Sequence, residues 1–493
     1  MKKTIWVTTF LLLLQSVSVF AAEPTAADMM AALEGMKKQM MELQQTIEKQ
    51  NVRIQQLESR KVLEAPQANA NLQPAGAQPA ATMSDADFQK GISDNIGKSV
   101  PWMKGLKLGG DFRLRAESFN FSDNNPDENV ASDRTRNRFR IRLRYGVEKD
   151  FGDDWKMGFR LASATAGANG VATDNTSTNV TLGNPGYDVY KNIYIDRAYA
   201  QYSPNGLKDY GPIKGVSIGA GKFDNPFLRY STPIVWDGDV TPEGAYEKVT
   251  VQLMSTEDTK INVYNTFGQY IVNENAGVDT DVEMYGYQSA LNISTYGFGT
   301  DKPLDLTGAV SFYDYTNWSQ TVANNTAAVS FLRTNTLAAD DFRLIDFYPE
   351  VKFDANGTPV TLWYNYVKNL GNEGTDNARG IGQDIHDQDR AWGLGVKLNV
   401  AKKKGSWEAF YGYYEIGANA VVAAFNDSDL GGPGGAGYTN RQGHKFGVGY
   451  ALTDAIMVNW TGYVVTPLNP NAAVANSLNE TVFRSQADLV YKF

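Results

Sequence analysis

Arginine recurs at every second position in two neighbouring segments of the sequence, GGDFRLRAE and RNRFRIRLRYGVE, with apolar residues between the arginines. Successive side chains of an extended strand point to opposite faces, so this spacing places the guanidinium groups on one polar face. Another arginine falls on the polar face of the segment that follows. This arginine row consists of Arg113, Arg115, Arg138, Arg140, Arg142, Arg144 and Arg160.

The arginine row has two interpretations. Its members could simply pair with Asp111, Glu117 and Glu148, which share their face. Basic residues outnumber these acids, however, and rings of like charge in a narrow passage set the selectivity of a pore. On a lipid-facing wall each arginine would cost about 2–4 kcal/mol at the bilayer midplane. We therefore expect the row to line the interior of a barrel.

Other chemistry finds little support in the sequence. The chain has no cysteine, and its two histidines, His386 and His444, lie in no recognisable Ser/His/acid context. Aspartates near 123–133 and 427–429 match no defined calcium loop. The sequence therefore predicts no enzymatic activity, no metal and no cofactor. Its net charge of −9 also disfavours nucleic-acid binding, which needs clustered basic charge.

The elements that would position the arginines follow a period of two from Leu106 to Phe493. Each amphipathic run is long enough for the ~9–11 residues of a tilted membrane-crossing strand. The expected strands are 106–117, 136–149, 154–165, 190–202, 214–223, 245–255, 259–271, 283–294, 303–315, 341–353, 358–370, 389–400, 406–417, 442–452, 455–466 and 480–493.

The connections distinguish a membrane barrel from a soluble sandwich. Links after even-numbered strands are mostly tight, and links after odd-numbered strands are long, which is the arrangement of an outer-membrane barrel. Aromatic residues near strand ends suggest interfacial girdles; these are Phe119, Phe121, Trp155, Trp318, Trp392 and Trp407. The predicted fold over 101–493 is an all-β, antiparallel transmembrane barrel of about sixteen strands.

The N-terminus has the pattern of a signal peptide at 1–21. Lys2 and Lys3 precede an apolar run from Ile5 to Leu14, and Val19-Phe20-Ala21 offers a cleavage site. Residues 22–63 then predict an α-helical coiled coil, because apolar residues alternate at spacings of three and four. Its seam consists of Leu33, Met36, Met40, Leu43, Ile47, Gln50, Ile54 and Leu57. Residues 64–100 are rich in Ala, Pro, Gln and Asn and predict a flexible linker.

Two stretches, GKFDNPFLRYSTPIVWDGDVTPEG (221–244) and FNDSDLGGPGGAGYTNRQGH (425–444), give the sequence a resemblance to a known family. Over residues 100–493 it resembles the trimeric porins of Gram-negative bacteria, and more narrowly the putative porin family. The resemblance implies passive diffusion of small solutes, a homotrimer in outer-membrane lipid and a coiled coil in the periplasm. It also implies that the terminal Phe493 is the assembly signal.

The third long loop, 224–244, is too apolar for a solvated tip. In trimeric porins the third loop folds inward and narrows the channel, so the resemblance gives 224–244 that role. Its acids Asp237, Asp239 and Glu243 are then expected to face the arginine row. An outward loop that packs on a neighbouring subunit is the alternative.

The function expected from the sequence is an outer-membrane porin with a water-filled channel for small hydrophilic solutes and ions. The alternative is a barrel that sheathes a periplasmic partner or tethers the envelope through its coil. The sequence names no permeating solute.

Overall fold

The computed structural model of the protein describes 103–122, 134–165, 176–187, 189–228, 232, 234–274, 281–297, 301–318, 335, 341–371, 386–430, 439–468 and 481–493. The chain divides into two units, Met1–Asp85 and Ala86–Phe493, and every described residue belongs to the second. The predicted signal peptide (1–21), coiled coil (22–63) and linker (64–100) lie outside the described residues. Within the described ranges, no helix has the length and apolar character needed to cross a membrane.

The described part of the second unit is built from β-strands. They are β1 (Leu106–Ser122), β2 (Arg134–Asp150), β3 (Trp155–Ala164), β4 (Val180–Thr181), β5 (Asn192–Tyr202), β6 (Ile213–Lys222), β7 (Glu243–Ser255), β8 (Thr259–Asn273), β9 (Val282–Thr295), β10 (Leu304–Thr316), β11 (Phe342–Ala355), β12 (Thr358–Asn369), β13 (Arg390–Leu398), β14 (Trp407–Ile416), β15 (Arg441–Ala451), β16 (Ile456–Pro467) and β17 (Thr481–Lys492). Short 3₁₀ turns occupy Asn205–Leu207, His386–Asp389 and Ser428–Leu430.

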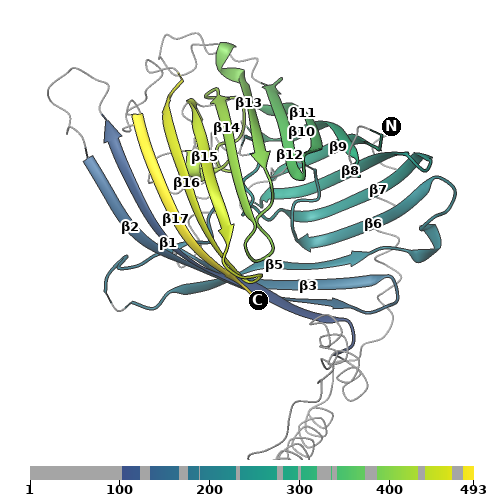
Figure 1. Ribbon diagram of the computed structural model, residues 1–493, viewed down its shortest axis with the longest axis horizontal. Coiled ribbons are helices and arrows are strands. Elements are labelled where there is room, and N and C mark those ends of the chain that lie inside the picture. The colour runs from purple at the N-terminus through teal and green to yellow at the C-terminus, as the bar shows by residue number, and fades with distance from the viewer. Residues whose placement is uncertain are drawn as a thin grey trace, which may run out of the picture. The chain divides into compact units, whose positions relative to one another are not determined.

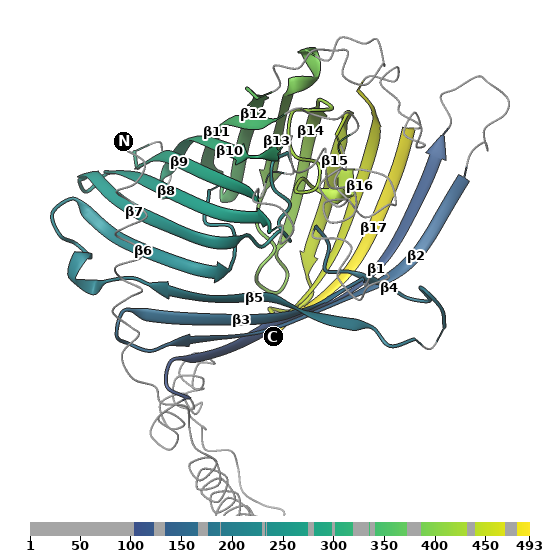
Figure 2. The same cartoon turned by 180° about the vertical axis from the view of Figure 1, so that it is seen from behind.

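Each strand pairs antiparallel with its neighbours, and the sheet closes on itself (Figures 1 and 2). Closure comes from β1, which pairs with β2 on one side and with β17 on the other. At the seam, Gly110 N donates to Phe493 O at 2.9 Å and Phe493 N donates to Gly110 O at 3.1 Å. The terminal Phe493 is thus part of the closing ladder.

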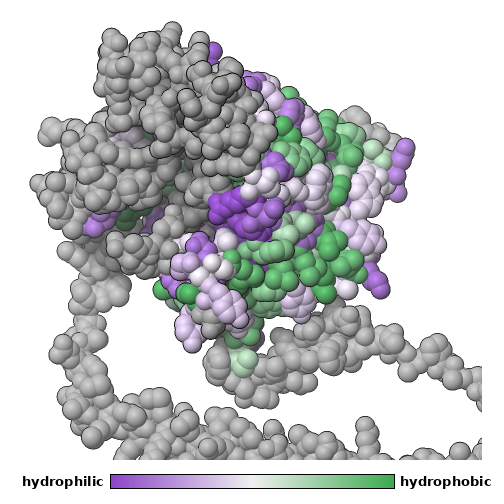
Figure 3. All heavy atoms as spheres, turned by 90° about the vertical axis from the view of Figure 1, so that its left-hand side faces the viewer, coloured by the Kyte–Doolittle hydropathy of each residue, from purple (hydrophilic) through white to green (hydrophobic). Residues whose placement is uncertain are grey.

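The alternation in the sequence explains which side chains face outward. Large apolar residues on the outer face are exposed, such as Leu114, Phe139 and Leu143 on β1 and β2, whereas the polar residues between them are covered. Apolar side chains gather over much of the wall that Figure 3 shows. An apolar outside with a polar inside is the inverse of a soluble barrel and suits a membrane-spanning one.

The predicted strands are all present, and the sequence missed only β4 and the last turn of β1. Most ends agree within one or two residues, but β1 continues past 117 to Ser122. β4 pairs with Arg140 and Ile141 of β2 and is too short to show a period. The predicted order of tight and long links is also present: the β11–β12 link is the two-residue turn Asn356-Gly357, where both φ angles are positive as a tight hairpin requires.

The expected aromatic girdles are confirmed only in part. Trp155 and Trp407 are exposed at the tight-turn end of the barrel, as expected. Phe119, Phe121 and Trp318 are instead buried, because each belongs to the inward-facing set of its strand or loop. Proximity to a strand end was the wrong criterion for these three, since the parity of the strand decides which face a side chain takes.

Candidate functional site

The arginine row lies on the inner face of the barrel, where strand register orders its charges. In the β1–β2 ladder, Arg113 lies opposite Arg142 and Arg115 lies opposite Arg140. Acids flank this central block, with Asp111 opposite Arg144 at one end and Glu117 opposite Arg138 at the other. The side chains of opposed residues point to the same face, so like charges meet in the middle of the wall. Such a block needs further carboxylates to be stable.

The closing strand β17 supplies one of these carboxylates. Asp488 lies opposite Arg115, whose Nε and Nη2 donate to the two carboxylate oxygens at 2.7 and 2.8 Å. Arg113 Nη1 lies 4.0 Å from the same carboxylate. This bidentate pair is the strongest geometry available to an arginine and a carboxylate.

Glu117 is the centre of a second group on the same wall. Its side chain has no exposed surface, and it accepts hydrogen bonds from Arg138, from Arg484 Nε at 2.8 Å and from Gln486 at 2.9 Å. The guanidinium groups of Arg138 and Arg484 also lie over the ring of Phe119, at 5.0 and 4.8 Å from its centroid. Phe119 therefore supports the charged wall, which explains why it faces inward.

The 223–242 loop, between β6 and β7, lies inside the barrel. Phe227 packs edge-on against Tyr313 of β10 and comes so close to Gly286 of β9 that a Cβ there would lie 2.5 Å from its ring. Gln288 of β9 exchanges two hydrogen bonds with the backbone of Leu228, at 2.7 and 2.9 Å. These strand residues belong to the inward-facing set, so the loop lies against the inner wall.

The far end of the same loop reaches the arginine row. Asp239 accepts a hydrogen bond from Arg144 Nη1 at 3.1 Å and another from the hydroxyl of Thr178 at 3.2 Å. Asp237 is turned away from the arginines, and its carboxylate accepts the backbone N–H of Asp239 at 2.7 Å. Glu243 lies outside this group: β7 begins there, and its exposed side chain pairs with Lys222 at 2.7 Å.

The two loop aspartates have opposite electrostatic surroundings. Burial and the nearby carboxylate of Asp427 raise the pKa of Asp237 well above its ordinary value. Burial acts in the same direction on Asp239, but the guanidinium groups of Arg142 and Arg144 outweigh it and lower the pKa of Asp239. Asp239 therefore carries the charge of this loop at neutral pH.

A second segment, 417–430, also enters the lumen, and the sequence analysis missed it. Asp429 pairs with Arg484 Nη2 at 2.6 Å and lies 3.5 Å from Arg115 Nη1. Phe425 stacks on Trp236 of the 223–242 loop, and Phe425 O accepts the N–H of Asp237 at 2.7 Å. The apolar run at 420–425 within a long link would have predicted an inward segment by the same argument used for 224–244.

A third segment, 176–181, covers the arginines from the side of β3. Asn179 accepts a hydrogen bond from Arg113, and Arg140 Nη2 donates to Ser177 at 3.3 Å. The sequence offered no indication of this segment, because short polar residues in a long link are typical of any loop.

Taken together, the wall is nearly neutral. Each of the seven arginines in the row has a carboxylate within 4.0 Å; the carboxylates are Asp111, Glu117, Asp196 and Asp488. Arg484 joins the row as an eighth cation, and Asp239 and Asp429 bring two more carboxylates from the loops. Eight guanidinium groups thus meet six carboxylates. The basic excess expected from β1–β3 alone is much reduced by residues from elsewhere in the chain.

This closed barrel with charged inner loops is the setting for the comparison with known proteins. The family model described as "Putative porin" matches residues 126–338 and 324–466, which together span more than half of the chain. The chain belongs to this porin family. A search of curated proteins found no match.

Solved porin structures are similar to this porin-family chain only in outline. The Pseudomonas putida OprB structure at high pH has a TM-score of 0.45 and 11% identity, and the match covers 82% of this chain and 97% of that one. Salmonella typhi OmpF in complex with daunomycin has a TM-score of 0.41, 12% identity and coverages of 79% and 98%. A mutant Rh. blastica porin has a TM-score of 0.39, 12% identity and coverages of 79% and 100%.

We expect Asp239→Asn to raise anion preference, because it removes a carboxylate that offsets Arg142 and Arg144. The reversal potential in a salt gradient across a planar bilayer measures this shift. Glu243→Gln is the matched control, since it removes the same charge from a residue that pairs with Lys222. Equal shifts for the two variants would show that general loop charge, and not the Asp239 contact, controls selectivity.

We also expect opposite pH dependences of stability for the two loop aspartates. Asp237 has a raised pKa, so its contribution is present at low pH and lost as pH rises above the ordinary carboxyl range; Asp237→Asn should stabilise the protein at neutral pH. Asp239 has a lowered pKa, so its contribution is present at neutral pH and lost as pH falls below about 4. Thermal unfolding of both variants between about pH 3 and pH 8 tests these signs, and a stabilising Asp239→Asn at neutral pH would contradict them.

Proposed function

We propose that this porin-family chain forms an outer-membrane channel for passive diffusion of small hydrophilic solutes and ions. The observation that carries the proposal is the contact between Asp239 and Arg144, made by a loop that runs inside the barrel. A barrel that served only as a wall would gain nothing from an apolar loop carrying a charge to the opposite side of its interior. A solute passing that contact would meet opposed charges at short range.

The mechanism follows from this arrangement of charges. Opposed fixed charges produce a transverse field that orders water and orients dipolar solutes. The remaining excess of two guanidinium groups gives a modest preference for anions over cations. Because ions in a wet lumen are screened over ~8–10 Å, this preference depends on groups at the contact itself and not on the net charge of the chain.

The assembly that we propose is a homotrimer in outer-membrane lipid, with its coiled coil in the periplasm. The heptad seam of 22–63 supports self-association, and the number three rests on the resemblance to trimeric porins. Phe493, which closes the β1–β17 ladder and stacks on Tyr491 with 5.8 Å between ring centroids, would be the assembly signal.

Deletion of 228–240 should raise single-channel conductance, because it removes the segment that lies inside the barrel and carries Asp239. Replacement of Arg138, Arg140 and Arg142 by Ser should move the reversal potential towards cations, since Asp111 and Glu117 then lose partners. Planar-bilayer recordings in salt gradients measure both effects, and Lys403→Gln, in an exposed turn, is the control. A parent protein that stays closed or leaks without defined steps would overturn the channel and favour the sheath.

The isolated 22–63 segment should form a parallel trimer. Analytical ultracentrifugation gives its mass directly. Replacing Gln50 by Leu should strengthen association and loosen the choice of strand number, because a polar residue in the seam favours specificity at the expense of stability. A monomer at high concentration would remove the coil from the proposed assembly.

A further inference from the structure

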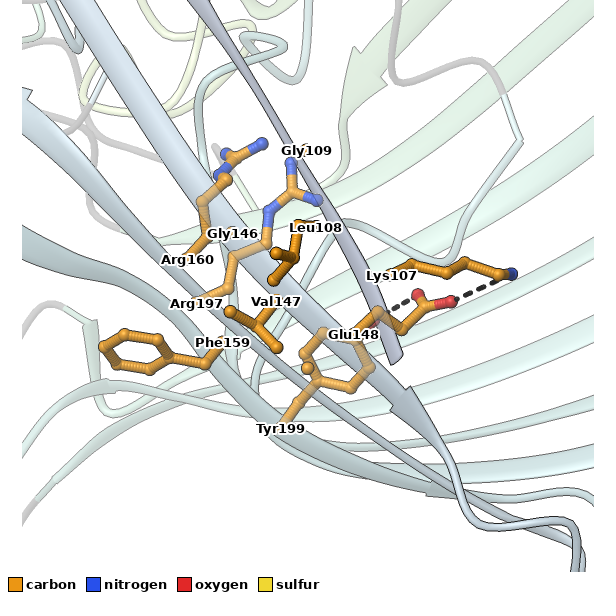
Figure 4. Close-up of a pocket in the computed structure, with 11 residues that line it drawn as sticks. Lys107, Leu108, Gly109, Gly146, Val147, Glu148, Phe159, Arg160, Arg197 and Tyr199 are labelled. Carbon is orange, nitrogen blue, oxygen red and sulfur yellow. Dashed lines mark hydrogen bonds and ion pairs between the residues drawn. The ribbon is translucent and has the colours of Figure 1, made fainter. Parts of the chain in front are cut away.

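A cavity of about 260 Å³ lies on the inner side of β1, β2, β3 and β5, between the arginine row and the tight-turn end of the barrel. Figure 4 shows its lining, with Arg160 and Arg197 turned to one side and Glu148 held by Lys107 and Tyr199 at the other. The glycines at 109, 146 and 158 contribute no side chains to its floor. Nothing in the proposed contact at Asp239 requires this cavity.

A β-bulge creates the basic end of the cavity. The β3–β5 register shifts between Arg160 and Leu161, so that Arg160 lies opposite Arg197 while Leu161 lies opposite Ile195. The extra residue, Asp196, is buried and pairs with Arg160. A bulge redirects side chains, and here it places two consecutive charged residues of β5 on the inner side.

Two guanidinium groups directly opposite each other repel, and the neighbouring carboxylates offset this only in part. Arg160 pairs with Asp196, and Arg197 pairs with Asp224, whose side chain is 60% exposed. One buried nitrogen of each arginine, Arg160 Nη2 and Arg197 Nε, has no hydrogen-bond partner. The pair therefore retains hydrogen-bonding capacity suited to an oxyanion.

The other end of the cavity excludes cations as its preferred ligands. Glu148 is the acidic residue of the lining, and it already has Lys107 at 3.5 Å, Lys156 at 3.4 Å and the hydroxyl of Tyr199 at 3.3 Å. A second cation would have to displace these groups. An anion at the arginine end meets no such competition.

We propose that this cavity is a binding site for a small oxyanion, a carboxylate or phosphate group held between Arg160 and Arg197. The site deepens the proposed channel function by naming small anionic solutes as the class retained beside the pore, and it rests on that function for its role in transport. Its volume fits a compact organic acid or phosphate and not a bulky ligand.

Inorganic phosphate and acetate are the probes, with glycerol as a neutral control, titrated by calorimetry into the full-length protein in detergent. Arg197→Gln should weaken phosphate binding by about tenfold, the effect of losing one charge-assisted hydrogen bond. Asp224→Asn should strengthen binding, because it frees Arg197 from an exposed carboxylate. Lys403→Gln, which changes the same charge on a remote exposed turn, should bind as the parent does.

The opposite signs of the two variants keep the test decisive, since a general loss of folding cannot tighten binding. No phosphate or acetate binding by the parent, or equal effects of Arg197→Gln and Lys403→Gln, would overturn the site. Binding in detergent does not require conduction, so bilayer recordings of the same preparation test the channel separately. Conduction without binding removes the site alone, whereas binding without conduction removes the channel and leaves the site.

Discussion

The pairing of β1 with β17 is the constraint on which the rest of the structure depends. Hydrocarbon offers no hydrogen bonds to backbone groups, so a sheet that crosses a membrane has to leave no open edge. Joining the first strand to the last fixes their register, and that register places Asp488 opposite Arg115 and Gln486 opposite Glu117. The charged interior is therefore a consequence of closure as much as of local sequence.

Inside the closed sheet, burial and charge act together. Removing one partner of a buried ion pair leaves the other charge uncompensated, which costs about 3–5 kcal/mol. Glu117 has three donors, so no single arginine is solely responsible for it. The loops reach the charged wall because aromatic contacts hold them against the opposite wall, as Phe227 does on Tyr313. The electrostatic contact and the hydrophobic one lie on different sides of the barrel, and the 223–242 loop connects them.

The sequence predicted the strands well because membrane strands obey one simple rule, the alternation of apolar and polar side chains. It placed the arginines on one face for the same reason. It did not predict the partners of those arginines, since Asp488, Arg484 and Asp429 approach them only through closure and loop folding. Arg484 and Asp488 stand on the polar face of the last strand, so pairing that strand with the first would have found them. Asp196 depends on a bulge, which has no counterpart in a period of two, and Glu243 fell at the boundary where a loop becomes a strand.

Gly286 has a consequence for how such a barrel changes over evolution. The ring of Phe227 occupies the space that any larger residue at this position would need. A single added methyl group on β9 would push the loop inward without altering one residue of the loop itself. Variation in the wall is thus an independent route to a different bore, and homologues with identical inner loops need not have the same width.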